Sequence, residues 1–128
     1  MRSTTMLFVK DVEAASAWFQ EFLGVESGHG GPEFEMLLAD GELILQLHLI
    51  EEGHHDHAVS LSGPLGSGVV VVLYVDDAKA LFERAKALKL SIAEELHFNE
   101  LAHMQEFSVI EPNGYSLMIC QPGDSGDG

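Results

Sequence analysis

The sequence of 128 residues predicts an α+β protein built from two βαβββ modules. Each half begins with an apolar strand that leads into an amphipathic helix, and each half ends in strands joined at a glycine turn. The segment LFVKD at 7–11 also reappears as LYVDD at 73–77. A duplication explains this repeat, because a single unit leaves one sheet face uncovered until a second unit meets it. A chain of this length is typical of one domain.

The first half contains one helix whose two ends are marked in the sequence. Residues 6–9, MLFV, predict a short strand, and Asp11 after it is a helix N-cap residue. Over 12–23 the apolar residues recur at spacings of three and four, which indicates one buried helix face. Gly24 suits the helix end, and SGHGGP at 27–32 is turn material.

Two strands are predicted next, over 33–39 and 42–49. They are joined by Asp40-Gly41, a pair that tolerates the positive φ angles of a tight hairpin turn. Residues 51–67 are polar and rich in glycine, serine and histidine, so we interpret them as a linker.

The second half repeats this plan. Residues 68–75 predict a buried strand, and Asp76 or Asp77 is expected to cap a helix that runs to about Leu88. Three further strands are expected, with a turn at Pro112-Asn113-Gly114 before the last; they cover 90–96, 103–110 and 115–121.

Composition excludes several classes of function. Six basic residues stand against twenty-one acidic ones, giving a net charge of −15, so the chain has no basic surface for nucleic acid or for an anionic membrane. One cysteine, Cys120, cannot form an internal disulfide, and the N-terminus lacks the pattern of a signal peptide. We therefore expect a cytoplasmic protein.

The two halves resemble one known family. LFVKD-VEAASAWFQEFLG in the first half, and YVDD-AKALFERAKAL followed by FSVIEPNGYSLMI in the second, are similar to the vicinal oxygen chelate superfamily of glyoxalases, bleomycin-resistance proteins and extradiol dioxygenases. The resemblance implies an open β-barrel-like cavity between the modules. It implies one domain over 1–128, with modules at about 4–50 and 68–121, the linker 51–67 and a frayed tail at 122–128.

The resemblance also locates the positions that hold a divalent metal in relatives. In this sequence they fall at Thr4, Gln46, Val70 and Met118. Threonine, valine and methionine do not supply the expected ligands, and glutamine does so weakly. We therefore predict no metal and no cofactor, and neither glyoxalase I activity nor ordinary extradiol cleavage. A displaced metal site would have to use His48 and Glu106.

Strand alternation indicates which side chains line the predicted cavity. Glu106 and Ser108 share a face, as do Gln46 and His48. Glu106 is then the one carboxylate that alternation directs inward, which makes it a candidate general base. The alternatives are an exposed or ion-paired glutamate at Glu106 and a rim histidine with one hydrogen bond at His48.

Further residues are expected to contact a ligand. Tyr74 alternates with Val70 and Val72, Met118 lies on the last strand, and His97 and His103 flank a polar loop that often lies near the cavity mouth in relatives. Solvated loop histidines are an equal alternative. The run His54-His55-Asp56-His57 is interpreted as adventitious, because consecutive loop residues rarely aim at one ion. Cys120 is expected to be a buried small hydrophobe.

These residues support two main hypotheses. The first is a metal-independent member of the superfamily that binds a small organic molecule and acts as a homodimer. The second is a lyase, isomerase or dioxygenase with a displaced metal site, drawn from His48, Glu106 and His97 or His103. Nothing in the sequence favours a purely structural module.

Overall fold

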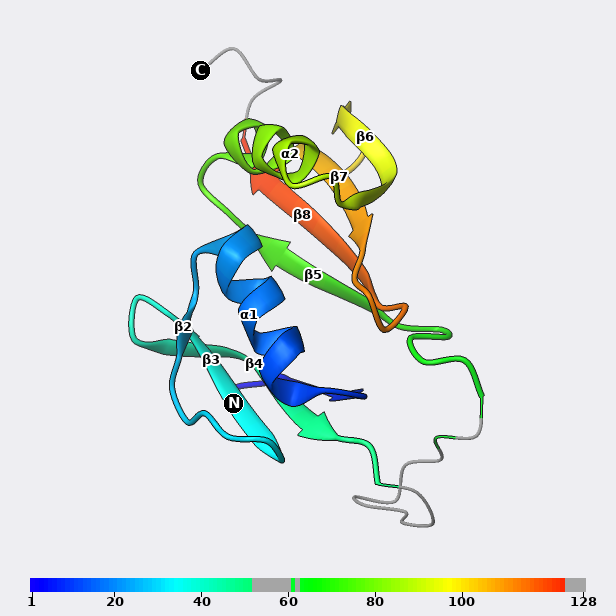
Figure 1. Cartoon of the computed structure of the whole chain (residues 1–128). Helices are drawn as coiled ribbons and strands as arrows, with labels where there is room; N and C mark the ends of the chain where they lie inside the picture. Colours follow the sequence, from blue (N-terminus) through cyan, green and yellow to red (C-terminus); the bar gives the residue numbers. More distant parts are fainter. Residues whose placement is uncertain (52–60, 62, 124–128) are drawn as a thin grey trace. The chain divides into compact units, whose positions relative to one another are not determined.

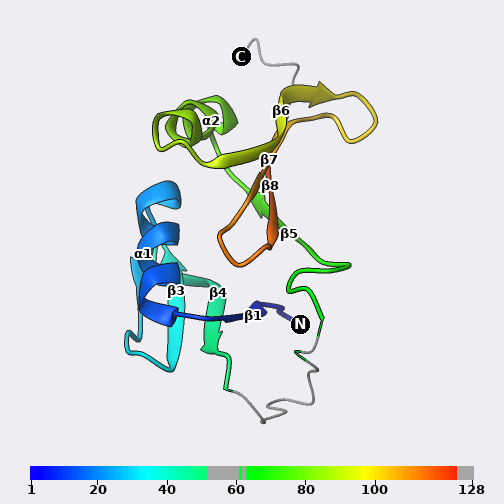
Figure 2. The ribbon, with the colours of Figure 1, turned by 45° about the vertical axis from the view of Figure 1, so that its right-hand side comes forward.

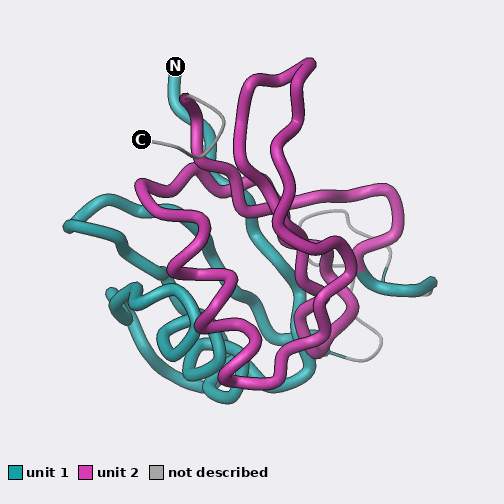
Figure 3. Tube along the Cα trace, turned by 90° about the horizontal axis from the view of Figure 1, so that it is seen from above, with its two compact units in different colours: residues 1–65 teal, residues 66–128 magenta. Residues whose placement is uncertain are grey.

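The computed structural model describes residues 1–51, 61 and 63–123. The chain divides into two compact units, residues 1–65 and 66–128, which Figure 3 colours separately. The boundary lies inside the predicted linker. None of the helices in the described part is both long and apolar enough to cross a bilayer.

The first unit is one sheet with one helix (Figure 1). Its elements in chain order are β1 (Thr5–Val9), α1 (Val12–Leu23), β2 (Glu26–Ser27), β3 (Phe34–Ala39) and β4 (Glu42–Leu49). The strand order is β1-β4-β3-β2, with β1 parallel to β4 and the other pairs antiparallel. Asp40 and Gly41 have φ angles of 50° and 79°, which confirms the tight turn between β3 and β4.

Helix α1 begins and ends where the sequence predicts. The Asp11 carboxylate accepts a hydrogen bond from the Ala14 backbone N–H at 3.0 Å, and Gly24 closes the helix in the left-handed conformation with a φ of 72°. The buried helix face packs on β3 and β4. The fully buried large side chains of this core include Phe19, Phe22, Leu37, Leu45 and Leu47.

The second unit repeats the arrangement. Its elements are β5 (Val70–Tyr74), α2 (Ala78–Ala87), β6 (Ser91–Asn99), β7 (Met104–Ile110) and β8 (Ser116–Pro122). The strand order is β5-β8-β7-β6, with β5 parallel to β8 and the other pairs antiparallel. The β6–β7 hairpin is seen from the side in Figure 2. Asp77 is the cap of α2, because its carboxylate accepts from the Ala80 N–H at 3.0 Å.

Helix α2 covers one face of the second sheet. The rings of Phe82 and Phe107 meet edge to face with centroids 5.3 Å apart, and Leu117 and Ile119 are fully buried. Gly66 has a φ of 80°, and a Cβ there would lie 2.7 Å from the carbonyl oxygen of Gly114. The linker thus approaches the Pro112-Asn113-Gly114 turn so closely that only glycine fits.

The α+β class and the βαβββ order of both modules are confirmed, and three details of the prediction are wrong. Strand β5, predicted to be buried, leaves one face exposed: Val71 is buried, whereas Val70, Val72 and Tyr74 are exposed, because an apolar run indicates a strand but not which of its faces is covered.

The short strand β2 uses Ser27, which was predicted as turn, because two residues are too few to produce a periodic pattern. Strand β6 continues to Asn99 instead of ending at 96, and His103 lies in the following turn with a φ of 59°. The continuation of β6 was not predicted because residues 97–99 were assigned to the polar loop.

Candidate functional site

Four residues form a row across the second sheet, one from each strand. The register pairs Tyr74 with Cys120, Cys120 with Glu106, and Glu106 with His97. Because Phe107 packs against α2 and side chains alternate along a strand, this row lies on the other face of the sheet. We call it the Glu106 face.

A second row lies next to the first on the same face. Val72 pairs with Met118, Met118 with Ser108, and Ser108 with Glu94. The Ser108 hydroxyl donates to Oε1 of Glu94 at 2.8 Å, and Ser108 is buried. Val70 lies two residues before Val72 on β5 and is therefore on the same face. The predicted site residues Tyr74, His97, Glu106, Ser108 and Met118 therefore occupy one face of one sheet.

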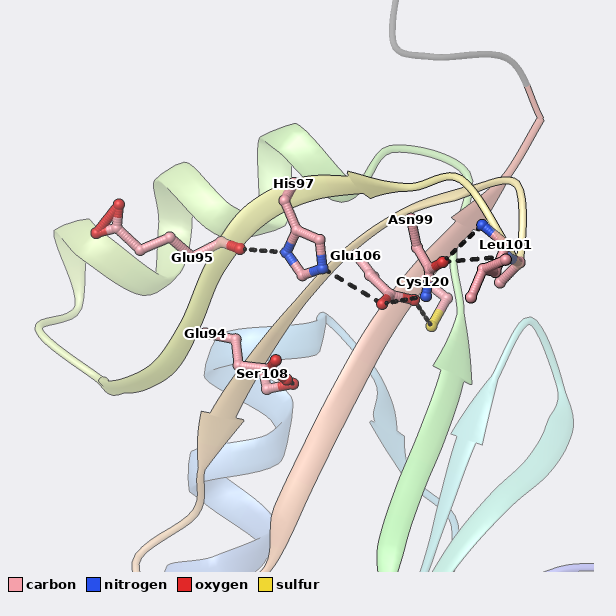
Figure 4. Close-up of polar contacts among 9 residues, drawn as sticks. Glu94, Glu95, His97, Asn99, Leu101, Glu106, Ser108 and Cys120 are labelled. Atoms are coloured by element: carbon pink, nitrogen blue, oxygen red, sulfur yellow. Dashed lines mark hydrogen bonds and ion pairs between the residues drawn. The ribbon is translucent and has the colours of Figure 1, made fainter.

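Glu106 is 7% exposed and its carboxylate has three neighbours (Figure 4). The side-chain amide of Asn99 donates to Oε1 at 2.9 Å. Nε2 of His97 lies 3.4 Å from the same oxygen, and the Cys120 thiol lies 3.9 Å from Oε2. Glu106 is thus a buried carboxylate and not the exposed glutamate of one alternative. The ion pair of the other alternative forms with His97 when its imidazole is protonated.

Asn99 also holds the turn between β6 and β7. Its Oδ1 accepts hydrogen bonds from the backbone N–H groups of Leu101 at 3.0 Å and Ala102 at 3.1 Å. Asn99 is not among the residues predicted from the sequence, because its segment was predicted to be a polar loop. One sequence signal could have found Asn99. An asparagine directly before a short turn commonly forms a side-chain hydrogen bond with the backbone two residues further on.

His97 has an oxygen acceptor at each ring nitrogen. Nδ1 lies 2.8 Å from the backbone carbonyl of Glu95, while Nε2 faces Glu106 (Figure 4). Only the imidazolium form donates a hydrogen bond from both nitrogens. The side chain is 45% exposed, so it lies at the border of the Glu106 face.

Apolar side chains flank Glu106 on the β5 side. Val70, Val72 and Tyr74 are 55%, 39% and 68% exposed, although valine and tyrosine are large apolar or amphipathic groups. The face therefore changes from apolar at β5 to acidic and polar at β7 and β6. Such a combination of apolar surface with a few convergent polar groups is typical of small-molecule sites.

Cys120 lies beside Glu106 but is fully buried. Burial raises the pKa of its thiol, and the neighbouring Glu106 carboxylate raises it further by charge repulsion and by accepting its hydrogen bond. The thiolate is the nucleophilic form of cysteine, so this environment suppresses nucleophilic chemistry.

The remaining predicted residues lie elsewhere. Gln46 and His48 are on β4 of the first unit, where His48 has Nδ1 2.8 Å from the Leu49 carbonyl and its ring 4.9 Å from that of Phe8. The ring of His103 contacts that of Phe98 at 5.3 Å instead of Glu106. Residues 54–57 lie outside the described residues.

The residues at the family's metal positions do not fit a divalent ion. Thr4 precedes β1 and, together with Arg2 and Glu42, lines a pocket of about 580 Å³ in the first unit. Val70 and Met118 carry no nitrogen or oxygen donor, and Gln46 offers one amide. Within 1–51, 61 and 63–123, no three His, Cys, Asp or Glu side chains gather closely enough to hold an ion.

Glu106 is one of three buried carboxylates among the described residues. Glu35 is 3% exposed and Glu111 is 1% exposed. Glu35 lies on the helix-facing side of β3, where Ser16 and Ser27 donate to Oε2 at 2.9 and 2.7 Å. Strand alternation did not predict the burial of Glu35 and Glu111. Their hydrogen-bond donors lie on other elements or in a turn, so no alternating pattern marks them.

Burial and hydrogen bonding act in opposite directions on Glu35. Desolvation would raise its pKa, but hydrogen bonds from Ser27, from the backbone of Gly30 and His29, and from Ser16 outweigh it and lower the pKa to about 2. Glu35 is therefore a structural carboxylate that ties α1, β2 and the following turn to β3.

Comparisons with known proteins give a family and a fold. A family profile described as Glyoxalase/Bleomycin resistance protein/Dioxygenase superfamily matches residues 3–119. No curated protein matches the chain. TioX from Micromonospora sp. ML1 is similar with a TM-score of 0.74 and 17% identity, covering 94% of this chain and 98% of that one.

Two further solved structures carry enzyme names. A lactoylglutathione lyase from Agrobacterium tumefaciens has a TM-score of 0.71 and 20% identity, covering 94% of this chain and 92% of its own. A glyoxalase-related enzyme from Fulvimarina pelagi has a TM-score of 0.73 and 18% identity, with coverages of 94% and 87%. At these identities the similarity shows the fold.

Proposed function

Because this chain belongs to the Glyoxalase/Bleomycin resistance protein/Dioxygenase superfamily, we propose that it binds a small organic molecule on the Glu106 face without a divalent metal ion. The observation that carries this proposal is that exposed Val72 and Tyr74 lie on the same sheet face as the buried, hydrogen-bonded Glu106, with β8 between them. The apolar part supplies contact area, while Glu106 and Ser108 orient polar groups.

The absence of a metal is part of the proposal. The donor set at Thr4, Gln46, Val70 and Met118 supports it, since a divalent ion needs about three converging protein donors. Elemental analysis of the purified protein, after removal of any affinity tag, tests this part. We expect no stoichiometric metal; a stoichiometric transition metal would overturn it.

Binding is tested by nuclear magnetic resonance with a fragment library on the ¹⁵N-labelled protein. Hits are expected to shift the backbone amides of β5, β7 and β8. Val72→Asn should abolish these shifts because it places an amide on the apolar part. Leu101→Asn makes the same kind of change at a side chain that is 101% exposed in the β6–β7 turn, and should leave binding intact.

Two results would contradict the binding proposal. One is a library without hits on these strands, and the other is equal binding by the wild type and by Val72→Asn. Thermal unfolding of both variants separates lost binding from lost folding.

Catalysis by Glu106 is a second candidate, favoured by the way the carboxylate is held. Asn99 fixes Oε1, while Oε2 has the long thiol contact at 3.9 Å, so Oε2 is the atom placed to accept a proton. Once a ligand is identified, turnover that disappears in Glu106→Gln while binding persists would support the base role. Unchanged turnover would exclude it.

A further inference from the structure

The Glu106 face carries negative charge at one end and apolar side chains at the other. We propose that it selects small molecules in which a cationic nitrogen is attached to an apolar body. This inference rests on the proposed binding function and names its ligand class.

Two of the three partners of Glu106 are neutral and do not compensate its negative charge. Asn99 and Cys120 are neutral donors. Among the described residues, the partner of Glu106 that can carry positive charge is His97, whose Nε2 lies 3.4 Å from Oε1 and whose side chain is 45% exposed. A buried carboxylate is stabilised by a cation much more than by neutral donors, since charge-assisted hydrogen bonds are stronger. A ligand ammonium beside Glu106 would supply that stabilisation.

Fixed positive charge lies on the opposite side of the second unit. Its lysines and arginines are all on α2 or directly after it: Lys79, Arg84, Lys86 and Lys89. Helix α2 packs on the face that contains Phe107, and Lys86 already pairs with Glu83 at 3.1 Å. Glu94, hydrogen-bonded to Ser108, adds a second carboxylate near Glu106. The Glu106 face therefore attracts cations and repels anions.

The protein places one of its own nitrogen atoms where a ligand nitrogen would lie beside Glu106. His97 presents Nε2 to Glu106, and in its imidazolium form this is a planar cation against the carboxylate. A cationic nitrogen on a ligand would take the same place relative to Oε1 or approach Oε2. The position beside Oε1 of Glu106 thus already accommodates a nitrogen-containing ring.

The separation of the two ends sets the size of the ligand. Tyr74 and Glu106 lie on β5 and β7, with β8 between them. Neighbouring strands are about 4.8 Å apart, so the two backbones are about 10 Å apart. A benzyl group with a quaternary nitrogen bridges most of this distance, with its ring on Val72, Met118 and Tyr74. Tyrosine also favours cations through its ring face.

The test compares two probes of the same shape. Benzyltrimethylammonium and neopentylbenzene differ in one atom, a positively charged nitrogen in place of a carbon. Titration of each into ¹⁵N-labelled wild-type protein should give amide shifts on β5, β7 and β8, with the cation bound about fivefold more tightly. This comparison in the wild type does not depend on any variant being folded.

Two variants then assign the preference to one carboxylate. Glu106→Gln keeps the shape of the side chain and should bring the two affinities together. Glu95→Gln removes the same charge from β6, but its side chain points away from Glu106 (Figure 4), so the preference should persist. Thermal unfolding checks that both variants are folded.

The outcomes separate the two proposals. Equal affinity of the two probes, or tighter binding of the neutral one, would overturn the cation preference and leave the binding site in place. No shifts with either probe on these strands would overturn both. A preference that survives in Glu106→Gln would remove Glu106 as its source.

Discussion

Asn99 donates a hydrogen bond from its side-chain amide to Oε1 of Glu106 at 2.9 Å, while its own Oδ1 accepts from two backbone N–H groups in the β6–β7 turn. One side chain therefore fixes both a turn and the buried carboxylate of the candidate site. In the proposed function this contact would make Asn99 a positioning residue, because it would act on a ligand only through Glu106.

Replacing Asn99 is expected to weaken both the turn and ligand binding. Asn99→Ala should lower the free energy of unfolding by about 1–3 kcal/mol, since it removes a donor to a buried carboxylate. Asn99→Asp keeps the Oδ1 acceptor for the backbone N–H groups of Leu101 and Ala102. Its carboxylate, however, repels the carboxylate of Glu106, so this variant should also weaken ligand binding. If both variants bind the benzyltrimethylammonium probe as the wild type does, the positioning role is excluded; urea unfolding measures the stability effect.

Glu35 should make the stability of the protein depend on acid pH. Its folded-state pKa of about 2 lies below the ordinary value of 4.5, so the carboxylate contributes stability that is fully present above pH 4.5 and is lost as the pH falls toward 2. The shift corresponds to about 3 kcal/mol at pH 7. Urea unfolding at pH 7 and at lower pH measures it.

The matched variants are Glu35→Gln and Glu26→Gln. The first removes the buried charge and should cost about 3 kcal/mol at pH 7, with a flatter acid dependence. The second changes an exposed glutamate on β2 and should stay within about 0.5 kcal/mol of the wild type. Equal stabilities of the two variants at pH 7 would contradict the structural role of Glu35.

Cys120 should be unreactive in the native protein. It is fully buried and its thiol pKa is raised by burial and by Glu106, so the thiolate is scarce and shielded. Ellman's reagent at pH 8 should label the native chain at least about 100-fold more slowly than the urea-unfolded chain. Rapid stoichiometric labelling of native protein would show that the Glu106 face opens to solvent at Cys120.

The homodimer expected from the family resemblance is tested by sedimentation equilibrium. We predict a species of twice the 13.9 kDa chain mass at micromolar concentration. A single species at the chain mass would contradict the prediction. Repeating the experiment at high salt checks that the charge of −15 does not by itself suppress association at low ionic strength.

The features that could be predicted from the sequence are those with local causes. Asp11 and Asp77 cap their helices through N–H groups three residues away, and Asp40-Gly41 makes its turn from its own backbone preferences. The apolar spacing of α1 likewise depends on neighbours within the same helix. Cap, turn and helix therefore appear in the sequence as short patterns.

The candidate site was predicted in part. Alternation placed Glu106 and Ser108 on one face because side chains on a strand have a period of two. It did not distinguish Glu106 from Glu35 and Glu111, which are more deeply buried. The donors to Glu35 include Ser16 on α1, far away in the sequence, so no local pattern marks them.

By itself, the sequence determined the α+β class, the repeat of the two modules except for the short strand β2, the helix boundaries and the chemical types of residue on each strand face. Only the tertiary structure decided that Tyr74, Cys120, Glu106 and His97 form one row across four strands, and that Asn99 holds Glu106. The physical reason is strand register. Which residues meet across a sheet depends on how separate segments align, and the β6–β7 pairing contains two register shifts that no local pattern specifies.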